Sequence, residues 1–445
     1  MFPVDFIPHL SNASGFDLES FIRAHQMPAL TSIRYNPSKT EQQKEHQQPI
    51  AWCSEGYYLP QRPDFTLDPA FHAGAYYVQE ASSMSISNFL TEQFGQSRNL
   101  KILDLCAAPG GKSTLLLSWL NGEGFLVANE VIKTRAAILR DSISRWGYAN
   151  AAVSSNDPFQ FKRLPNAFDV ILVDAPCSGS GMFRKDSSAM KHWSLDAVEH
   201  CAARQNRIVE DVWTALKPNG LLIYATCSYS TAENEDITKL IASELGGSII
   251  KSKTLSNTID IIENEYGYRF YPNRIGGEGF YVSCIRKQAD EYIPRRPSNK
   301  PKIKLQPCGS EMIDLLNNAN AYFETSSHLG KTILPEVEIE WISNLFEELH
   351  LLKLGISQGD SLKGKFIPDH DLALFNQLNS NVPSSNLSLA EALKYLKKES
   401  LQNPEELRGI HLVRYEGLGL GWANAVQGRL NNSLPKSWRI LKDIE

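Results

Sequence analysis

The middle of the chain alternates between short apolar runs and longer stretches of helical pattern. The apolar runs lie at 101–105, 125–129, 151–154, 170–174 and 221–226, and the helical stretches at 114–120, 134–146 and about 197–216. This alternation predicts a doubly wound α/β fold around a parallel sheet. A further run at 279–285 alternates like a late edge strand.

The regions on either side have different patterns. Residues 1–68 mix helical pattern with turns, and Phe16, Phe21 and Ile22 can share one helix face. A helix at 79–86 is expected to lead into the first buried strand, and 41–48 is a polar loop. Beyond 286, the proline-rich basic stretch 293–304 is typical of a linker. Helical segments are expected at 311–318 and 336–352, and the chain from about 363 is punctuated by glycine and favours strands.

Composition narrows the class of protein. The chain has 445 residues, of which 42% are hydrophobic, enough for a sizeable core. Seven cysteines without a CxxC argue against a zinc ribbon, an iron–sulfur site or a disulfide scaffold, and fit a reducing cytoplasm. The N-terminus lacks a signal-peptide pattern, and apolar runs fall short of the ~20 residues that span a bilayer. A net charge of −5 means that any RNA contact must come from local patches.

Two cysteines follow two of the predicted strands. Cys177 lies in Asp174-Ala175-Pro176-Cys177-Ser178-Gly179, and Cys227 lies in Thr226-Cys227-Ser228. Ligands of open α/β sheets bind outside the carboxyl ends of the strands, so both thiols should face one pocket. Two thiols without a metal-ligand pattern indicate covalent chemistry. The remaining cysteines at 53, 201, 284 and 308 fit the commoner structural role of small buried apolar groups.

A loop of small residues follows the strand at 101–105 and opens the helix at 114–120. It consists of Cys106, Ala107, Ala108, Pro109, Gly110, Gly111 and Lys112. Such a loop lets a ligand approach backbone N–H groups at a helix N-terminus. The GxGxxG spacing of a dinucleotide fold is absent. Gly111-Lys112-Ser113 matches the end of a P-loop, but Cys106 stands where the first P-loop glycine belongs, so a nucleotide hydrolase is a distant alternative.

S-adenosylmethionine fits this region better, because acids end the next two strands. Glu130 ends the second strand, where such folds place an acid that binds ribose hydroxyls. Asp157 follows the third strand and can accept from the adenine amino group. Either acid alone also fits a solvated loop carboxylate. Their placement at successive strand ends favours the cofactor site.

Two thiols beside a methyl donor narrow the chemistry to methyl transfer onto a pyrimidine carbon. Cytosine C5 is a poor nucleophile until a thiolate adds to C6. A base must then remove the C5 proton so that the thiolate can leave, and the reaction therefore needs two groups. We expect Asp174 to hydrogen-bond the amino edge and N3 of the ring, and Lys112 to position that acid or the substrate.

At these motifs the chain resembles the NOL1/NOP2/Sun family of RNA cytosine-5 methyltransferases. The resemblance rests on Gln79-Glu80-Ala81-Ser82-Ser83-Met84, the loop 106–112, the segment 174–179, Thr226-Cys227-Ser228 and Glu233-Asn234-Glu235. It implies that Cys227 is the nucleophile and that Cys177 promotes release. It also implies cofactor binding by the loop 106–112, Glu130, Asp157 and Asp174.

Other segments are similar to the bacterial small-subunit rRNA methyltransferases of the RsmF/YebU type. These segments are 32–36, 181–186, Trp193, Arg204-Gln205, 363–374, 421–424 and 435–440. The resemblance implies a class I, Rossmann-like S-adenosylmethionine methyltransferase domain at 71–288, after a small N-terminal α+β RNA-associated domain at 1–70. A linker and helical intermediate domain would occupy 289–362, and a PUA-like RNA-binding β domain 363–445.

The resemblance thus implies an RNA (cytosine-5) methyltransferase that acts in the cytoplasm on 16S rRNA, free or in the small ribosomal subunit. It implies no membrane partner and no metal. Transfer RNA is the alternative substrate. A non-catalytic RNA-binding assembly factor is a more distant alternative, against which the presence of both cysteines, the acid and the cofactor loop argues. The acidity of the chain departs from the charge expected of an RNA binder.

Overall fold

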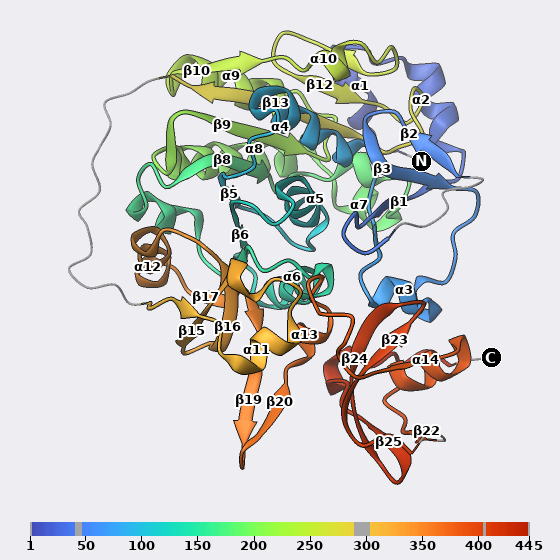
Figure 1. Ribbon diagram of the computed structural model, residues 1–445. Helices are drawn as coiled ribbons and strands as arrows, with labels where there is room; N and C mark the ends of the chain where they lie inside the picture. The colour runs from blue at the N-terminus through green and yellow to red at the C-terminus, as the bar shows by residue number, and fades with distance from the viewer. Residues whose placement is uncertain (1, 41–46, 289–302, 404–405, 444–445) are drawn as a thin grey trace.

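A computed structural model describes residues 2–40, 47–288, 303–403 and 406–443 (Figure 1). Its largest sheet has the strand order β11-β12-β13-β9-β8-β5-β6-β7-β17, with β10 paired to β13. The parallel strands are β5 (Lys101–Asp104), β6 (Phe125–Asn129), β7 (Ala151–Ser154), β8 (Phe168–Asp174) and β9 (Leu216–Thr226). The antiparallel strands beside β9 are β10 (Gly247–Ile250), β11 (Ile262–Glu263), β12 (Tyr268–Phe270) and β13 (Phe280–Lys287).

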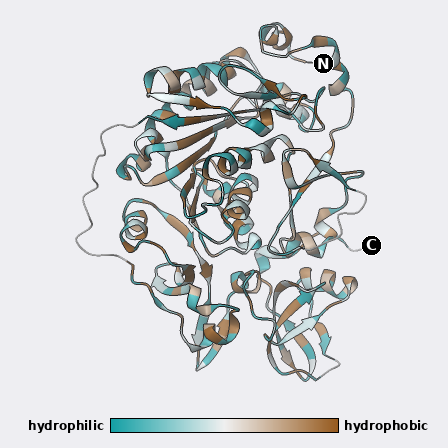
Figure 2. Ribbon diagram, turned by 45° about the horizontal axis from the view of Figure 1, so that its top comes forward, coloured by the Kyte–Doolittle hydropathy of each residue, from teal (hydrophilic) through white to brown (hydrophobic). Residues whose placement is uncertain are grey.

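The central residues of the parallel strands are apolar and buried because both faces of the sheet are covered. Successive residues face opposite sides, so Leu172 joins one apolar cluster and Ile171 the other. The first cluster receives side chains from α4 (Ile86–Phe94), α5 (Gly111–Leu120) and α6 (Lys133–Trp146). The second receives them from α8 (Leu195–Trp213), α9 (Glu235–Glu244) and α12 (Ile339–Glu348). Brown, hydrophobic segments gather on the central strands and the helices around them (Figure 2).

The chain before 81 builds its own small sheet. The sheet contains β1 (Thr31–Tyr35), β2 (Gln48–Ile50), β3 (Cys53–Leu59) and β4 (Tyr76–Val78), and the helices are α1 (Phe6–Leu10), α2 (Leu18–His25) and α3 (Pro69–His72). Phe6 and Phe21 pack in one apolar cluster with Phe183, Trp193 and Tyr229 of the central region. The N-terminal helices therefore rest directly on the segment that follows Cys177.

The chain after 303 begins a further small sheet, then adds a strand to the central sheet, and then forms the remaining sheets. β17 (Leu351–Leu354) pairs antiparallel with β7 and becomes the edge of the largest sheet. Around it lie β14 (Gln306–Pro307), β15 (Tyr322–Ser327), β16 (Gly330–Pro335), β18 (Ile356–Ser357), β19 (Gly359–Leu362), β20 (Lys365–Pro368) and α11 (Ser310–Leu315). The tail contains α13 (His370–Ala373), β21 (Ser384–Asn386), α14 (Leu389–Leu396), β22 (Leu401–Asn403), β23 (Gly409–Tyr415), β24 (Leu418–Val426) and β25 (Gly428–Asn432).

The structure confirms most expected elements of the central region. The strands at 125–129 and 151–154 have the predicted bounds, and the helix at 134–146 begins one residue earlier. Of the segment 79–86, only 82–86 is helical, as a 3-10 turn that continues into α4. The helix expected at 336–352 is shorter, because it ends at Glu348 and Leu351 begins β17. Most of the polar loop 41–48 and of the linker 293–304 lies outside the described residues. Within the described ranges, a search for a helix able to cross a membrane finds none.

Candidate active site

The two cysteines meet at the carboxyl ends of β8 and β9. These strands run parallel and in register up to Asp174 and Ala225, so the segments that follow them emerge side by side. The sulfur atoms of Cys177 and Cys227 lie 3.3 Å apart, and both residues are partly exposed, as free thiols. The two thiols therefore lie side by side at this edge of the sheet.

The carboxylate of Glu233 joins the two cysteine segments. Its Oε1 accepts from the Ser178 backbone N–H at 2.6 Å, and its Oε2 accepts from the Ser178 and Ser228 hydroxyls at 2.6 and 2.5 Å. Each serine directly follows one of the cysteines. Glu233 itself is fully buried. One buried carboxylate thus fixes the position of both thiols relative to each other.

The thiol of Cys177 holds its proton strongly. The hydrogen bond with Cys227 contributes most to raising the pKa of Cys177 well above its ordinary value, followed by burial and the charges of Cys227 and Glu233. Two of these causes, the hydrogen bond and the charge, come from Cys227. The pair therefore favours a protonated Cys177 beside the other sulfur.

Lys112 and Asp174 form an ion pair beside the cysteines. Lys112 Nζ lies 2.7 Å from Asp174 Oδ2, and the side chains are 16% and 29% exposed. Burial alone would lower the pKa of Lys112, but the Asp174 carboxylate outweighs it, and the pKa is raised. Because the amine stays charged, it holds the carboxylate of Asp174 beside the two cysteines.

The loop 106–112 turns tightly between β5 and α5. Its Ala108–Pro109 peptide is cis, and Gly110 has φ of +113°, a conformation that favours glycine. A side chain there would also meet Ser142, since a Cβ would lie 2.8 Å from the Ser142 Cβ. The N–H groups of the first turn of α5 have no intrahelical acceptor by geometry, so they can bind a ligand carboxylate.

Asn129 ties together the ends of the three strands that carry the expected cofactor residues. Its amide donates to the carbonyls of Leu105 and Asn156, both at 3.0 Å, and its Oδ1 accepts from the Asn156 N–H. Glu130 follows it, buried, and its carboxylate lies 3.2 Å from Arg135 Nη1. Asp157 is exposed and caps the next 3-10 turn through the Phe159 N–H.

These groups fit S-adenosylmethionine. Asp104 is completely buried below the loop, and its Oδ1 has no hydrogen-bond partner among the described residues. Burial, with the Asp174 charge, raises the pKa of Asp104 to about 7 although a Ser113 hydrogen bond opposes it. Beside the acids, Val131, Ile132 and Phe159 expose apolar surface of the kind an adenine ring covers. Carboxylates, free N–H groups and this apolar surface match the hydroxyls, carboxylate and base of the cofactor.

A cleft of about 430 Å³ lies between the N-terminal sheet and the segment that follows Cys177. Its lining includes Arg62, Gln79, Glu80, Arg184 and Lys185. Arg184 is tied to Glu278 at 2.9 Å, whereas Arg62 and Lys185 are exposed. The cleft therefore offers local positive charge on a chain that is acidic as a whole.

Sequence reasoning placed Cys177, Cys227, Asp174 and Lys112 in one site, and the structure brings them together. It missed the roles of Asn129 and Glu233, since both act through contacts between distant segments. The one signal for Glu233 was its place in the quoted Glu233-Asn234-Glu235 motif. Among the described residues, no cluster of three His, Cys, Asp or Glu side chains could hold a metal ion.

The Rossmann-like sheet with this loop and these strand-end acids defines a methyltransferase that uses S-adenosylmethionine. Family models agree: residues 94–286 match "16S rRNA methyltransferase RsmB/F", residues 2–81 match "N-terminal domain of 16S rRNA methyltransferase RsmF", and residues 383–440 match "Methyltransferase RsmF PUA domain". The chain belongs to the family of ribosomal RNA small subunit methyltransferase F, as its curated relatives show.

The relatives match over nearly the whole chain. The ribosomal RNA small subunit methyltransferase F of Vibrio atlanticus is 30% identical over 98% of this chain and 97% of its own. That of Shewanella loihica is 31% identical over 87% of this chain and 83% of its own. Among solved structures, a methyltransferase homologue from Pyrococcus horikoshii is 27% identical, with a TM-score of 0.53 over 63% of this chain and 94% of that one.

Proposed function

We propose that this protein transfers a methyl group from S-adenosylmethionine to C5 of a cytosine in 16S rRNA, through a covalent bond to Cys227. The observation that carries the proposal is the 3.3 Å separation of the Cys177 and Cys227 sulfur atoms at the ends of two parallel strands. The relatives are named as ribosomal RNA small subunit methyltransferases, and this name supports the RNA substrate. An rRNA substrate is in turn consistent with a protein that acts in the cytoplasm.

In the proposed reaction the Cys227 thiolate adds to C6, and the electron pair of the C5=C6 bond moves toward C5. The Lys112–Asp174 pair stands where a carboxylate can accept from the amino group and orient N3 of the ring. S-adenosylmethionine would supply an electrophilic methyl group, and C5 takes it as the sulfonium S–CH3 bond breaks and its electron pair stays on sulfur, which leaves S-adenosylhomocysteine. A base removes the C5 proton, that electron pair re-forms the C5=C6 bond, and the Sγ–C6 bond breaks to return the Cys227 thiolate.

Cys177 is our candidate for that base, and its pKa explains the order of events. Before attack, the hydrogen bond and charge of Cys227 keep the pKa of Cys177 high, so its thiol stays protonated and does not compete as nucleophile. Once the Cys227 sulfur is bonded to carbon, both of these causes disappear. Burial and the Glu233 charge still act, so the pKa of Cys177 falls toward its ordinary value, and the thiol can release its proton to water before it accepts the C5 proton.

The basic cleft beside the catalytic segment supports an RNA substrate. Arg62 and Lys185 project into the cleft of about 430 Å³ that also contains Gln79 and Glu80. Phosphate contacts from such side chains give affinity and orientation without reading sequence. This proposal includes the four domains expected from the sequence. In it, the N-terminal domain at 1–70 and the PUA-like domain at 363–445 contact the RNA.

The test is a denaturing gel of the Cys177→Ala variant after incubation with 16S rRNA or intact small subunits and S-adenosylmethionine. We expect a slowly migrating RNA–protein adduct, because attack still occurs and release does not. The adduct should vanish in the Cys177→Ala, Cys227→Ala double variant, and sequencing the trapped RNA would name the cytosine.

Two outcomes would contradict the proposal. An adduct that survives replacement of Cys227 would remove Cys227 as the nucleophile. Labelled methyl groups appearing on a base other than cytosine with the wild-type protein would rule out the cytosine-5 reaction, while leaving the family assignment in place.

A further inference from the structure

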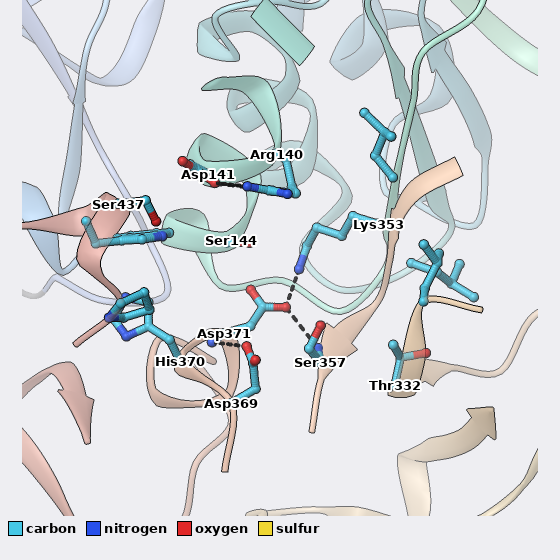
Figure 3. Close-up of a pocket in the computed structure, with 15 residues that line it drawn as sticks. Arg140, Asp141, Ser144, Thr332, Lys353, Ser357, Asp369, His370, Asp371 and Ser437 are labelled. Carbon is cyan, nitrogen blue, oxygen red and sulfur yellow. Dashed lines mark hydrogen bonds and ion pairs between the residues drawn. The ribbon is translucent and has the colours of Figure 1, made fainter. Parts of the chain in front are cut away.

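A second cavity, of about 300 Å³, lies where three parts of the chain meet, and we call it the junction pocket (Figure 3). Its lining comes from α6, from β16 to β18, from the start of α13, and from the segment 435–438. The pocket is open at one side, where the Arg140 side chain is 47% exposed. Its volume is at the lower end of the range of clefts that hold small organic groups.

The junction pocket contains buried polar atoms whose hydrogen-bonding capacity is unused. The His370 side chain is 9% exposed, and neither ring nitrogen has a hydrogen-bond partner within the described parts of the chain. Thr332 Oγ1 and Asp371 Oδ1 are also buried and have no hydrogen-bond partner among the described residues. Native proteins leave few such atoms unpaired, because each costs about 1–3 kcal/mol. Four such atoms, from three residues that line one cavity of this size, point to an occupant.

Charge pairing in the lining indicates what kind of occupant fits. Lys353 is bound to Asp371, whose Oδ2 also accepts from the Ser357 N–H, and Arg140 lies 3.2 Å from Asp141 (Figure 3). With its cations already paired and Asp369 also present, the pocket does not suit a phosphate. Burial lowers the pKa of His370 to about 4, so the ring stays neutral and offers one donor and one acceptor.

Apolar surface completes the lining. Leu329, Leu354, Pro435 and Trp438 border the pocket, and the His370 and Trp438 rings meet edge to face at a centroid distance of 4.4 Å. A ligand that fits is flat, uncharged and apolar on its faces, with donors and acceptors around its rim. A nucleobase has these properties, and proteins recognise unpaired RNA bases by contacts to such faces and edges.

We infer that the junction pocket binds one unpaired nucleobase, supplied by the RNA substrate away from the methylated cytosine. The inference rests on the proposed function for the identity of the RNA. The pocket is also linked to the catalytic side through α6: Ser142 packs against Gly110 of the cofactor loop, and Ser144 lines the pocket. A base held there would fix the RNA relative to the cofactor site.

Two variants test the inference: Thr332→Val, which removes one unpaired hydroxyl, and His370→Phe, which keeps a ring without nitrogens. Each should weaken binding of 16S rRNA, measured by filter binding and as KM, by about fivefold. Neither should lower the melting temperature, and Thr332→Val should raise it, since an unpaired buried group is lost. A residue needed only for folding would show the opposite change in stability.

Thr325→Val is the matched control. Thr325 is the cross-strand partner of Thr332, and its Oγ1 is equally buried and unpaired among the described residues, but it does not line the pocket. This variant should gain similar stability and leave RNA binding unchanged. Equal RNA affinity of wild type, Thr332→Val and His370→Phe would overturn the assignment to RNA.

Free nucleosides distinguish the source of the base. Adenosine, guanosine, cytidine and uridine are each added to the wild type and to Thr332→Val in thermal unfolding. One outcome would overturn the inference that the base belongs to the RNA substrate. In it, a nucleoside stabilises the wild type but not Thr332→Val, and the two proteins bind RNA equally well. The pocket would then bind a free nucleoside. Filter binding does not depend on methyl transfer, so the pocket is tested even where the cytosine-5 reaction fails.

Discussion

The cysteine site and the junction pocket use buried polar groups in opposite ways. Around the cysteines, the Glu233 carboxylate, the Ser178 hydroxyl and the Ser228 hydroxyl are all satisfied by one another. In the junction pocket, His370, Thr332 and Asp371 keep atoms without partners among the residues that the structure describes. The protein thus satisfies the polar groups that position its cysteines, whereas buried polar atoms of the junction pocket remain unpaired among the described residues.

The difference follows from what each region must do. A nucleophile and its partner need a fixed geometry before the substrate arrives, because small displacements are costly to rate. A recognition pocket gains specificity from polar groups that only the correct ligand satisfies, at a cost in stability of the free protein.

Removal of the nucleophile gives the largest expected effect. Cys227→Ala should lower methyl transfer at least about a thousandfold, because the proposed reaction begins with the bond from Cys227 to C6. The measurement is transfer of labelled methyl from S-adenosylmethionine to 16S rRNA. Cys284→Ala is the control, since Cys284 is a fully buried cysteine on β13, and it should lower stability with little effect on the rate.

Disruption of the Glu233 contacts should have the next largest effect on the rate. Glu233→Gln replaces an acceptor with a donor toward Ser178 or Ser228, so the cysteine segments separate and kcat should fall by about ten- to a hundredfold. KM for the cofactor should not change. Glu92→Gln is matched chemically, because Glu92 accepts two backbone N–H groups and the Ser252 hydroxyl far along the chain. A similar fall in kcat for both variants would speak against a positioning role.

A smaller change is expected at the cofactor site. Glu130→Ala should weaken S-adenosylmethionine binding about tenfold, which corresponds to the loss of one charged hydrogen-bond acceptor. Calorimetric titration measures this directly, with Glu123→Ala as a surface control. Unchanged affinity would remove Glu130 from the site.

The last prediction concerns the stability of the protein rather than its activity. It involves Asp104, which lies on the catalytic side but, unlike the groups around the cysteines, has an unpaired buried oxygen among the described residues. Burial raises the pKa of Asp104 in the folded protein to about 7, above its unfolded value. Its protonated form therefore favours folding below pH 4, and this contribution is lost as the pH rises through 7. Asp104→Asn should gain stability relative to wild type between pH 5 and pH 8 in urea unfolding. A pH-independent difference would contradict the raised pKa.

Local sequence pattern predicted the central sheet well, because β5 to β9 contain short apolar runs that alternate with longer helical segments. It failed at Leu351 and Leu352, which were expected to end a helix and instead begin β17. This apolar run extends the period of α12, and only its pairing with β7 makes it a strand. Asn129 and Glu233 were missed for the same reason, since their contacts join segments far apart in sequence.

The pairing of β17 with β7 also has a mechanical consequence. An edge strand with unpaired N–H and C=O groups invites association with other chains. A fragment ending at 288 would lack β17 and expose β7, which leads toward Asp157. The sheet of the methyltransferase region is therefore closed by a strand from beyond residue 303, which covers the edge that β7 would otherwise expose.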